Sequence, residues 1–343
     1  MQRLIFTDDP RTEVAALVAM MNPDRVFTVA DSNTAMLMAV EGAELIVIPP
    51  GDACKGLASV QKVWEALVRG GATRRSLIVN LGGGMVTDLG GFAASTFKRG
   101  VRFVNVPTTL LGAVDAAVGG KTGINFMGLK NEIGAFREAD AVVVSARFFG
   151  TLPPQELMSG YAEMVKHALI ADADEYGRLL AADPLEIGAG EMLELLRRSI
   201  EVKRRIVAED PCEKGVRKAL NLGHTFGHAF EELALEKGEP AEHGRAVAHG
   251  LLAEMVVAHM TLGFPSAELQ RYAAWLRSHY HPMSVVCGDY PRMLELMAHD
   301  KKNSEAGAVN FSLLREPGAV KTDCTASSDT ITAALDIYRD LIC

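Results

Sequence analysis

The sequence predicts an α/β protein in which a parallel-sheet N-terminal domain is followed by an all-helical C-terminal domain. Short β-type runs alternate with helix-compatible stretches over the first 150 residues, and this alternation is typical of a parallel sheet with helices on its faces. A run of three glycines directly follows one of these β-type runs. From Gln155 to about His281 the hydrophobic pattern is almost continuously helical, which indicates a change of architecture along the chain.

The expected strands are short apolar runs bounded by turn signals. They span Val26–Asp31, Leu45–Pro50, Ser76–Leu81, Arg102–Pro107 and Ala141–Ser145, and a helix is expected at Ala58–Arg69. The pattern changes near Thr151-Leu152-Pro153-Pro154, so we expect one domain over residues 1–150 and a second over residues 151–343. Strong helical stretches in the second lie at Glu156–Ala171, Glu191–Ala208 and Gly244–Leu262. The apolar run Val309–Leu314 allows a late strand pair or hairpin.

Composition excludes several classes of protein. Of the 343 residues, 48% are hydrophobic and 23% are charged, and the net charge of −8 argues against a nucleic-acid surface. The five cysteines are odd in number and show no C-x-x-C spacing, which fits a reducing compartment. The segment MQRLIFTDDPRTEV has acids where a signal peptide needs a basic and then an apolar region, so we do not expect it to act as one. No uninterrupted apolar run in the sequence reaches the roughly 18 residues of a membrane span. We therefore expect a soluble cytoplasmic protein whose partners are neither membranes nor nucleic acids.

The glycine-rich turn is the first candidate binding feature. Ser76–Asp88 reads SLIVNLGGGMVTD, so a β-type run leads into Gly82-Gly83-Gly84 and then into a helix-compatible stretch. Glycines allow a ligand to approach the backbone, and a helix N-terminus attracts a diphosphate. Asp31 ends one expected strand and Asp52 follows another, and either could meet a ribose hydroxyl, as in Rossmann-like domains. The alternative is a tight strand–helix turn that binds nothing.

A second candidate feature is a group of metal-ligand residues. His224 and His228 lie four residues apart in NLGHTFGHA, which places both on one face of a helix. His243 follows, and Glu163 lies three residues before Lys166 in SGYAEMVK. Two or three imidazoles with one carboxylate form a common catalytic zinc set. The residues alone leave open which of these two histidines is a ligand. The sequence contains no H-E-x-x-H motif, so a zinc protease is not indicated.

Several charged residues stand in unusual sequence contexts. Asp115 lies in the apolar stretch LLGAVDAAVGG, where a charge is costly unless it is paired or functional. The cations of interest are Arg99, Lys121, Lys130, Lys166, Lys203, Arg217 and Lys301. Taken singly, each is typical of a solvated surface side chain, and spacing alone does not show that they converge.

The motifs taken together resemble one enzyme family. The run GGGMVTDLGGFAASTFKRGVRFVNVPTTLLGAVDAAVGGKTGINFMGLKNEIGAF resembles the nucleotide-binding core of the 3-dehydroquinate synthase family. The segments TLPPQELMSGYAEMVKHALI, EKGVRKALNLGHTFGHA and HDKKN follow in that family's order, so the resemblance covers roughly residues 45–315. It implies an NAD-binding Rossmann-like domain over 1–150 and a helical metal- and substrate-binding domain over 151–343.

The resemblance also implies site residues. The implied metal ligands are Glu163, His224 and His243, with His228 assigned to the substrate. The implied NAD contacts are Asp31, Asp52, Lys55, Gly83, Gly84, Asp88, Thr108, Thr109, Lys121, Lys130 and Thr151. The implied catalytic and substrate residues are Asp115, Lys121, Asn131, Lys166, Lys203, Glu213, Arg217, Asn221, His228 and Lys301, with Arg99 from a dimer partner. Asp52 stands where the family usually has Glu, and Arg245 stands where Glu is common.

The implied reaction converts 3-deoxy-D-arabino-heptulosonate 7-phosphate to 3-dehydroquinate and phosphate, a step of the shikimate pathway to aromatic amino acids. It proceeds by transient oxidation with NAD, phosphate elimination, re-reduction and intramolecular aldol closure. The implied cofactors are NAD and Zn²⁺, with Co²⁺ as an alternative, and the implied assembly is a homodimer. Arg217 and Lys203 would bind the substrate carboxylate, which a planar guanidinium can hold in bidentate fashion.

Three other interpretations compete with this one. A different sugar phosphate cyclase would take a heptulose without a carboxylate, which would leave Arg217 and Lys203 without a partner. A metal-dependent NAD polyol dehydrogenase would release NADH and would need no phosphate site. A non-catalytic NAD or metal sensor would not need Asp115, Lys166, Glu213 and His228 together with three ligands. No role is predicted for His249, His259 and His279.

Overall fold

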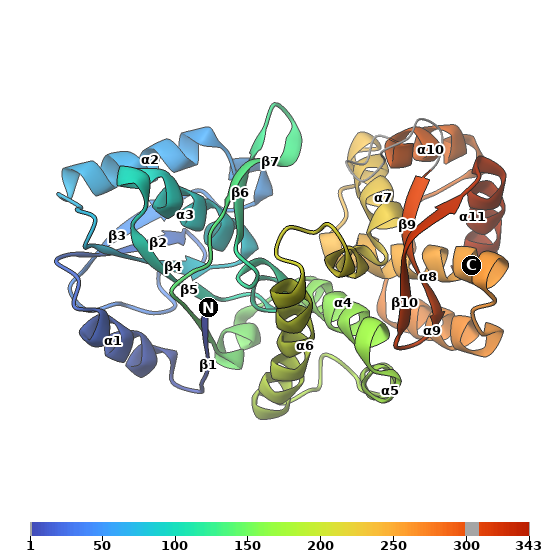
Figure 1. Ribbon diagram of the computed structural model, residues 1–343, viewed down its shortest axis with the longest axis horizontal. Helices are drawn as coiled ribbons and strands as arrows, with labels where there is room; N and C mark the ends of the chain where they lie inside the picture. The colour runs from blue at the N-terminus through green and yellow to red at the C-terminus, as the bar shows by residue number, and fades with distance from the viewer. Residues whose placement is uncertain (1, 299–308, 343) are drawn as a thin grey trace. The chain divides into compact units, whose positions relative to one another are not determined.

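The computed structural model describes residues 2–298 and 309–342, which form two compact units (Figure 1). The first unit comprises Met1–Pro153 together with Ile187–Ile200, and the second comprises Pro154–Glu186 together with Glu201–Cys343. The predicted Lys301 lies outside the described residues. Within the described part of the chain, no helix is long and apolar enough to cross a membrane.

The first unit is built on a six-stranded sheet whose paired strands all run parallel. The strand order is β1-β8-β5-β4-β2-β3. The strands are β1 (Arg3–Phe6), β2 (Val26–Asp31), β3 (Ala43–Ile48), β4 (Leu77–Gly82), β5 (Arg102–Pro107) and β8 (Ala141–Val144). Every residue of β4 and β8 is buried, as expected for parallel strands covered on both faces. The predicted parallel sheet is confirmed.

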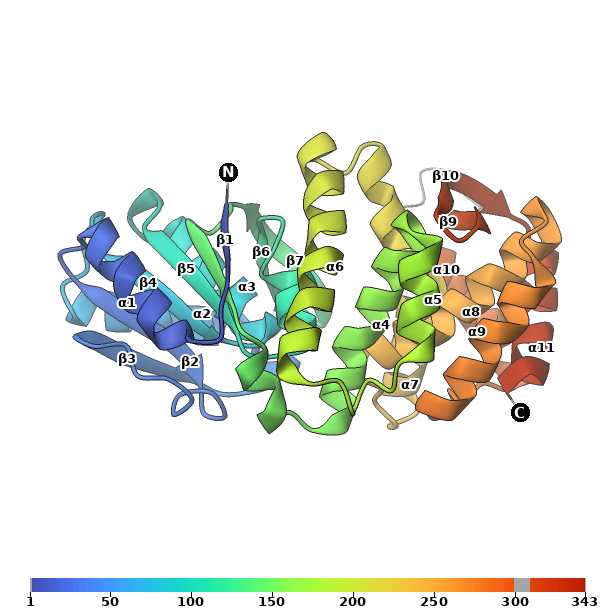
Figure 2. The same cartoon turned by 90° about the horizontal axis from the view of Figure 1, so that it is seen from below.

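Three helices cover this sheet: α1 (Pro10–Met21), α2 (Leu57–Arg69) and α3 (Gly84–Thr96). The chain moves one way along the strand order from β1 to β2 and the opposite way from β3 to β4 and from β4 to β5. Right-handed crossovers therefore place α1 on one face and α2 and α3 on the other, as Figure 2 lets the reader follow. The strand order reverses between β2 and β4, where ligands of open α/β sheets bind.

An antiparallel hairpin that the sequence did not predict follows β5. It consists of β6 (Lys121–Phe126) and β7 (Leu129–Phe136), and β6 packs against α3. Met127 and Gly128 form its turn with φ of 50° and 82°, as a two-residue hairpin turn of this twist requires. The backbone carbonyl oxygen of Lys55 accepts a 2.7 Å hydrogen bond from the backbone N–H of Asn125, which fixes the hairpin beside the start of α2.

The second unit is largely helical, as predicted. Its helices are α4 (Pro154–Ala171), α5 (Ala173–Ala181), the end of α6 (Ala189–Glu209), α7 (His224–Glu236), α8 (His243–Leu262), α9 (Ser266–His279), α10 (Tyr290–Ala298) and α11 (Ser328–Ile342). Helix α8 is buried along most of its length and contacts α4, α7, α9 and α11.

The expectation of an all-helical second part is wrong in one respect. An antiparallel hairpin joins β9 (Val309–Glu316) to β10 (Ala319–Ala326). The apolar run Val309–Leu314 forms most of β9, because β9 packs its apolar residues against α8. The chain then turns at Gly318, whose φ is 85°.

Candidate active site

Three residues of the second unit form a candidate metal centre. Glu163 of α4, His224 of α7 and His243 of α8 each place one ligand atom within 4.8 Å of the others. Glu163 is fully buried, and its Oε1 atom lies 3.5 Å from Nε2 of His224 and 3.7 Å from Nε2 of His243. That oxygen has no hydrogen-bond donor among the described residues. A divalent cation bound by these three atoms would remove the cost of the unsatisfied buried carboxylate, so the residues fit a catalytic zinc site.

The two imidazoles are oriented for this role by contacts at their other nitrogens. Nδ1 of His224 lies 3.1 Å from the carbonyl oxygen of Leu222. Nδ1 of His243 lies 3.1 Å from Oε2 of Glu231. Both partners can only accept a hydrogen bond, so each Nδ1 carries the proton and each Nε2 presents its lone pair toward Glu163.

Lys166 completes the buried part of this centre. It lies one helical turn after Glu163 on α4, is only 2% exposed, and forms an ion pair with Oε2 of Glu163. The ammonium therefore neutralises one carboxylate oxygen and leaves the other facing the two histidines. A buried ammonium at this position is well placed to stabilise negative charge on a nearby oxygen.

His228 lies beside the metal ligands without joining them. Its ring centroid is 5.3 Å from that of His224 and 6.1 Å from that of His243. It contributes no atom to the ligand group that Glu163, His224 and His243 form. His224 and His228, which helical spacing places on one face of the helix, therefore differ in that only His224 belongs to the candidate ligand group.

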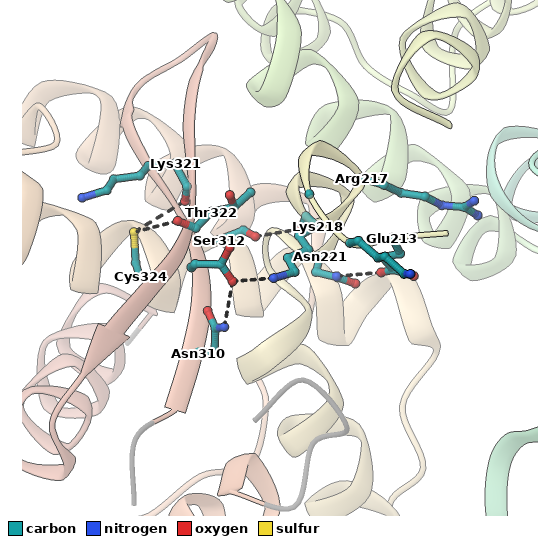
Figure 3. A network of polar contacts seen from close by, with 12 residues as sticks. Glu213, Arg217, Lys218, Asn221, Asn310, Ser312, Lys321, Thr322 and Cys324 are labelled. Atoms are coloured by element: carbon teal, nitrogen blue, oxygen red, sulfur yellow. Dashed lines mark hydrogen bonds and ion pairs between the residues drawn. The ribbon is translucent and has the colours of Figure 1, made fainter. Parts of the chain in front are cut away.

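The segment Val216–Asn221, a 3-10 helix, carries two predicted substrate residues. Figure 3 shows Arg217 and Asn221 on this segment and Glu213 just before it. Asn221 donates a 2.9 Å hydrogen bond to Glu213, whose φ is 58°, and Arg217 is 3% exposed. Predicted Lys203 is also buried, at 6% exposure. Among its described residues, the second unit therefore contains two buried cations in addition to Lys166.

The loop before Val216–Asn221 is shaped by one carboxylate. Asp210 accepts hydrogen bonds from the backbone N–H groups of Lys214, Gly215 and Arg217. These donors hold the pKa of Asp210 below its ordinary value. The guanidinium of Arg217 donates to the carbonyl oxygen of Pro211 at 2.8 Å, so the side chain is held against its own loop.

Contacts with the β9–β10 hairpin fix the other side of the same segment (Figure 3). Lys218 forms a 2.7 Å ion pair with Asp323, and Asn310 donates a 3.0 Å hydrogen bond to the same carboxylate oxygen. Ser312 donates to the carbonyl oxygen of Lys218 at 2.7 Å. The hairpin, which the sequence suggested only as one possibility, thus supports the segment that carries Arg217 and Asn221.

The first unit holds the predicted nucleotide turn at the point where the strand order reverses. Gly83 is the N-cap of α3 and makes no side-chain capping bond, so the first turn of α3 is open to an anion. A Cβ atom at Gly83 would lie 3.0 Å from Thr109, and one at Gly84 would lie 3.1 Å from Ala116. Oγ1 of Thr108 is buried without a hydrogen-bond partner among the described residues. These features fit a nucleotide cofactor.

A polar cluster joins further predicted cofactor residues to a predicted substrate residue. Nζ of Lys55 lies 2.6 Å from Oδ2 of Asp88 and 2.6 Å from Oδ1 of Asn131. Asn131 has a φ of 52° and follows Lys130, which lies 3.8 Å from Asp52. Lys55 itself is only 4% exposed. The structure therefore brings these five residues together at the tip of β6–β7.

The chain matches known proteins along nearly its whole length. Residues 45–159 match the family described as 3-dehydroquinate synthase N-terminal, and residues 160–303 match 3-dehydroquinate synthase C-terminal. A 3-dehydroquinate synthase of Parabacteroides distasonis is 43% identical to this chain, over 99% of the chain and 98% of its own length. The chain belongs to the 3-dehydroquinate synthase family. It is an enzyme of that family, within the sugar phosphate cyclase superfamily.

Solved structures place this member of the 3-dehydroquinate synthase family among other cyclases. A 2-epi-5-epi-valiolone synthase from Streptomyces hygroscopicus, determined with NAD⁺ and Zn²⁺ bound, superposes with a TM-score of 0.86 at 25% identity, over 99% of this chain and 97% of its own. A 2-deoxy-scyllo-inosose synthase complexed with carbaglucose-6-phosphate, NAD⁺ and Co²⁺ gives a TM-score of 0.84 at 23% identity, over 97% and 95%. The second comparison shows the fold alone.

Four other predicted residues of this family member belong to the first unit. Asp31 ends β2 and accepts backbone hydrogen bonds from Asn33 and Thr34, so its side chain caps its own turn. Thr151 donates to the carbonyl oxygen of Phe148, and Asp115 lies in the π-helical turn Gly112–Ala116. Lys121 is exposed at the start of β6.

Arg99 occupies a basic hollow on the first unit. The hollow has a volume of about 580 Å³ and is lined by Thr73, Arg74, Arg75, Lys98 and Arg99. Lys98 and Arg99 have φ values of 49° and 66°. Two successive non-glycine residues in the left-handed region are strained, and such strain is concentrated at functional sites.

Two carboxylates beside the metal ligands were not predicted from the sequence. Glu231 lies seven residues after His224 and therefore on the same face of α7, a spacing that could have identified it. Glu254 is a lone acid in the apolar run Leu251–Ala258, and this context is a signal that could have identified a paired or functional charge.

Proposed function

We propose that this enzyme converts 3-deoxy-D-arabino-heptulosonate 7-phosphate to 3-dehydroquinate and phosphate, with NAD and a divalent cation as cofactors. Family membership supports the reaction. The single structural observation that supports it most is the buried Oε1 atom of Glu163, which faces two imidazole nitrogens and has no hydrogen-bond donor among the described residues.

The cation site comprises Glu163, His224 and His243, and it takes Zn²⁺ or Co²⁺. When bound, the cation supplies a Lewis acid that polarises substrate oxygens and lowers the pKa of a bound hydroxyl. Lys166 lies against Glu163, and its ammonium stabilises negative charge that develops on a substrate hydroxyl beside it. Glu213, held by Asn221, orients a neighbouring hydroxyl or relays a proton.

Recognition of the substrate carboxylate is assigned to Arg217 and Lys203. Both are buried cations of the second unit, and a planar guanidinium holds a carboxylate with two parallel hydrogen bonds. This assignment distinguishes the proposed substrate from heptulose phosphates without a carboxylate. His228 of the same unit is assigned to the phosphate, together with Lys301.

The first unit is assigned the cofactor and part of the phosphate binding. NAD, when bound, would supply reversible hydride transfer, so the overall reaction would leave no net redox change. The open first turn of α3, the buried Thr108 hydroxyl and the cluster of Lys55 with Asp88 support its placement. The residues assigned to NAD are Asp31, Asp52, Lys55, Gly83, Gly84, Asp88, Thr108, Thr109, Lys121, Lys130 and Thr151, and those assigned to substrate are Asp115, Lys121 and Asn131.

A homodimer is part of the proposal. In it, Arg99 of one copy contacts the phosphate bound by the other copy. The strained backbone at Lys98 and Arg99 supports a functional role for this turn.

A phosphate-release assay tests the proposal. The purified enzyme is incubated with the heptulosonate phosphate, with and without chelator and after removal of NAD, while NADH absorbance is followed in parallel. We expect phosphate release that requires both cofactors and no steady rise in NADH. Steady NADH formation from a polyol would instead support the dehydrogenase alternative, and equal phosphate release from a heptulose phosphate without a carboxylate would support a different cyclase.

A further inference from the structure

Helices α7 and α8 each supply one metal ligand and one carboxylate that contacts the other helix. On α7 the ligand is His224 and the carboxylate is Glu231. On α8 the ligand is His243 and the carboxylate is Glu254. The arrangement is reciprocal. Glu231 of α7 contacts His243 of α8, and Glu254 of α8 contacts the residues next to His224 of α7.

Glu231 fixes the ring of His243. Its Oε2 atom lies 3.1 Å from Nδ1 of His243, and its side chain is 15% exposed. An ionised carboxylate only accepts hydrogen bonds, so this contact places the proton on Nδ1 and turns Nε2 toward Glu163. The alternative tautomer would carry its proton on Nε2 and could not bind a cation there.

Glu254 fixes the start of α7, where His224 is the first helical residue. Its carboxylate accepts backbone hydrogen bonds from Gly223 at 2.6 Å, Thr225 at 3.0 Å and Phe226 at 3.4 Å. Helix α7 has no side-chain cap of its own at Gly223, so Glu254 from the neighbouring helix serves as its cap. A buried carboxylate at a helix N-terminus is stabilised by the N–H groups and by the helix dipole.

The backbones of the helices approach closely enough to hold this geometry. A Cβ atom at Gly250 of α8 would overlap the carbonyl oxygen of Gly223, and one at Gly244 would overlap the backbone of Ser159 on α4. Gly244 also donates a 2.9 Å hydrogen bond to the Ser159 hydroxyl. Because the helices touch through their backbones, the reach of Glu231 and Glu254 is fixed by the main chain.

We propose that Glu231 and Glu254 are positioning residues of the metal centre. Neither belongs to the ligand group of Glu163, His224 and His243. Glu231 sets the tautomer and ring orientation of His243, and Glu254 sets the first turn of α7 and with it the position of His224. This inference rests on the metal site of the proposed function.

Metal affinity of the Glu231 variants provides the first test. Metal-stripped wild type, Glu231→Ala, Glu231→Gln and the matched control Glu232→Gln are titrated with Zn²⁺ in competition with a chromophoric chelator. We expect about 10- to 100-fold weaker binding for Glu231→Ala, a smaller loss for Glu231→Gln because an amide oxygen can still accept the Nδ1 proton, and no change for Glu232→Gln on the exposed face. The visible absorption of the Co²⁺-loaded protein should shift for Glu231→Ala only.

The outcomes of this titration are separable. Wild-type protein that bound neither Zn²⁺ nor Co²⁺ would overturn the metal site of the proposed function, and the inference with it. Wild-type protein that bound metal while Glu231→Ala bound it within twofold, with an unchanged Co²⁺ spectrum, would overturn the role of Glu231 and leave the proposed function intact.

Glu254 requires a design that tolerates a loss of stability, because its carboxylate is 1% exposed. Glu254→Gln is therefore titrated with Zn²⁺ beside wild type and beside His249→Gln, a change at an equally buried side chain of α8, using only the folded fraction isolated by size-exclusion chromatography. We expect Glu254→Gln to weaken Zn²⁺ binding at least tenfold and to shift the visible absorption of the Co²⁺-loaded protein, whereas His249→Gln leaves both unchanged. Zn²⁺ binding within twofold of wild type in Glu254→Gln, or an equal loss in His249→Gln, would show that Glu254 does not position His224.

Discussion

The ammonium of Lys218 lies 2.7 Å from a carboxylate oxygen of Asp323, and this ion pair ties the segment Val216–Asn221 to the β9–β10 hairpin. The pair is partly exposed to solvent, so its contribution to overall stability is expected to be small. Its position matters more than its strength, because the segment it holds carries Arg217 and Asn221. Changes in the hairpin should therefore be detected first in substrate binding.

We predict that Asp323→Asn raises the KM for the heptulosonate phosphate about twofold to fivefold with little change in melting temperature. The reason is that an exposed ion pair contributes roughly 0.2–1 kcal/mol, and this pair holds the segment that positions Arg217. Steady-state kinetics and thermal unfolding measure the two effects. Asp340→Asn, an exposed carboxylate on α11, is the control. A fall in melting temperature without a change in KM would contradict the prediction.

We predict that His224→Ala loses the bound cation, whereas His228→Ala retains it and loses activity. Nε2 of His224 faces Oε1 of Glu163 within the ligand group. His228 lies beside this group and contributes no ligand atom to it. Metal content of the two purified variants, measured by atomic emission, distinguishes them. Equal metal loss in both variants would show that the ligand assignment is wrong.

We predict that Arg217→Met weakens binding of a carbocyclic substrate analogue far more than binding of its decarboxylated counterpart. Removing one partner of a buried charge-assisted pair costs about 2–5 kcal/mol, much of it from the charge left unpaired. Thirty-fold or greater weakening, on the order of the lower end of that range, is expected for the carboxylate ligand only. Calorimetry on wild type and variant measures both ligands. If both weakened equally, Arg217 would not be the residue that recognises the carboxylate.

We predict that stability of the second unit falls as the pH drops from about 6.5 toward 4, because of His249. This imidazole is 1% exposed, contacts Tyr338 at 2.8 Å and the carbonyl oxygen of His281 at 2.9 Å, and burial lowers its pKa to about 4. Between about pH 6.5 and pH 4, His249 is protonated in the unfolded chain but stays neutral in the folded protein. The resulting loss in the free energy of unfolding reaches on the order of 3 kcal/mol at about pH 4.

Urea unfolding at several pH values tests this prediction. The fluorescence of Trp275 in a Trp64→Phe background reports on the second unit. His249→Gln should flatten the pH dependence between about pH 4 and 6.5, whereas His259→Gln, whose side chain is on the exposed end of α8, should leave it unchanged. An unaltered slope in His249→Gln would exclude this histidine as the source.

The sequence predicted those elements whose residues carry a strong burial signal. The strands Val26–Asp31 and Arg102–Pro107 are found with the predicted bounds because they are central and almost fully buried. Strand β1 has only four residues and none is fully buried, so it gave no comparable run. The β6–β7 hairpin escaped prediction because β7 is almost entirely exposed and therefore lacks an apolar alternation.

In the candidate site too, the sequence predicted the features that have a local pattern and missed those that depend on packing. Glu163 with Lys166, and His224 with His228, are neighbours on single helices, so helical spacing was enough to single them out. The contact between Glu231 and His243 and that between Glu254 and Gly223 join different helices. Such contacts depend on how helices pack, which no local pattern specifies. Spacing also could not show which of His224 and His228 is a candidate metal ligand, because that depends on which side chain faces Glu163 of another helix.

The glycine contacts between α4, α7 and α8 have a consequence for saturation mutagenesis of this enzyme. At Gly244 and Gly250 even an alanine would overlap a neighbouring backbone, so we expect both positions to reject every substitution as strictly as the histidine ligands do. A map of mutational tolerance would then mark two residues without any reactive group as indispensable. Intolerance at these glycines reports the spacing of the scaffold, and only a metal-binding measurement would tell them apart from residues that take part in the chemistry.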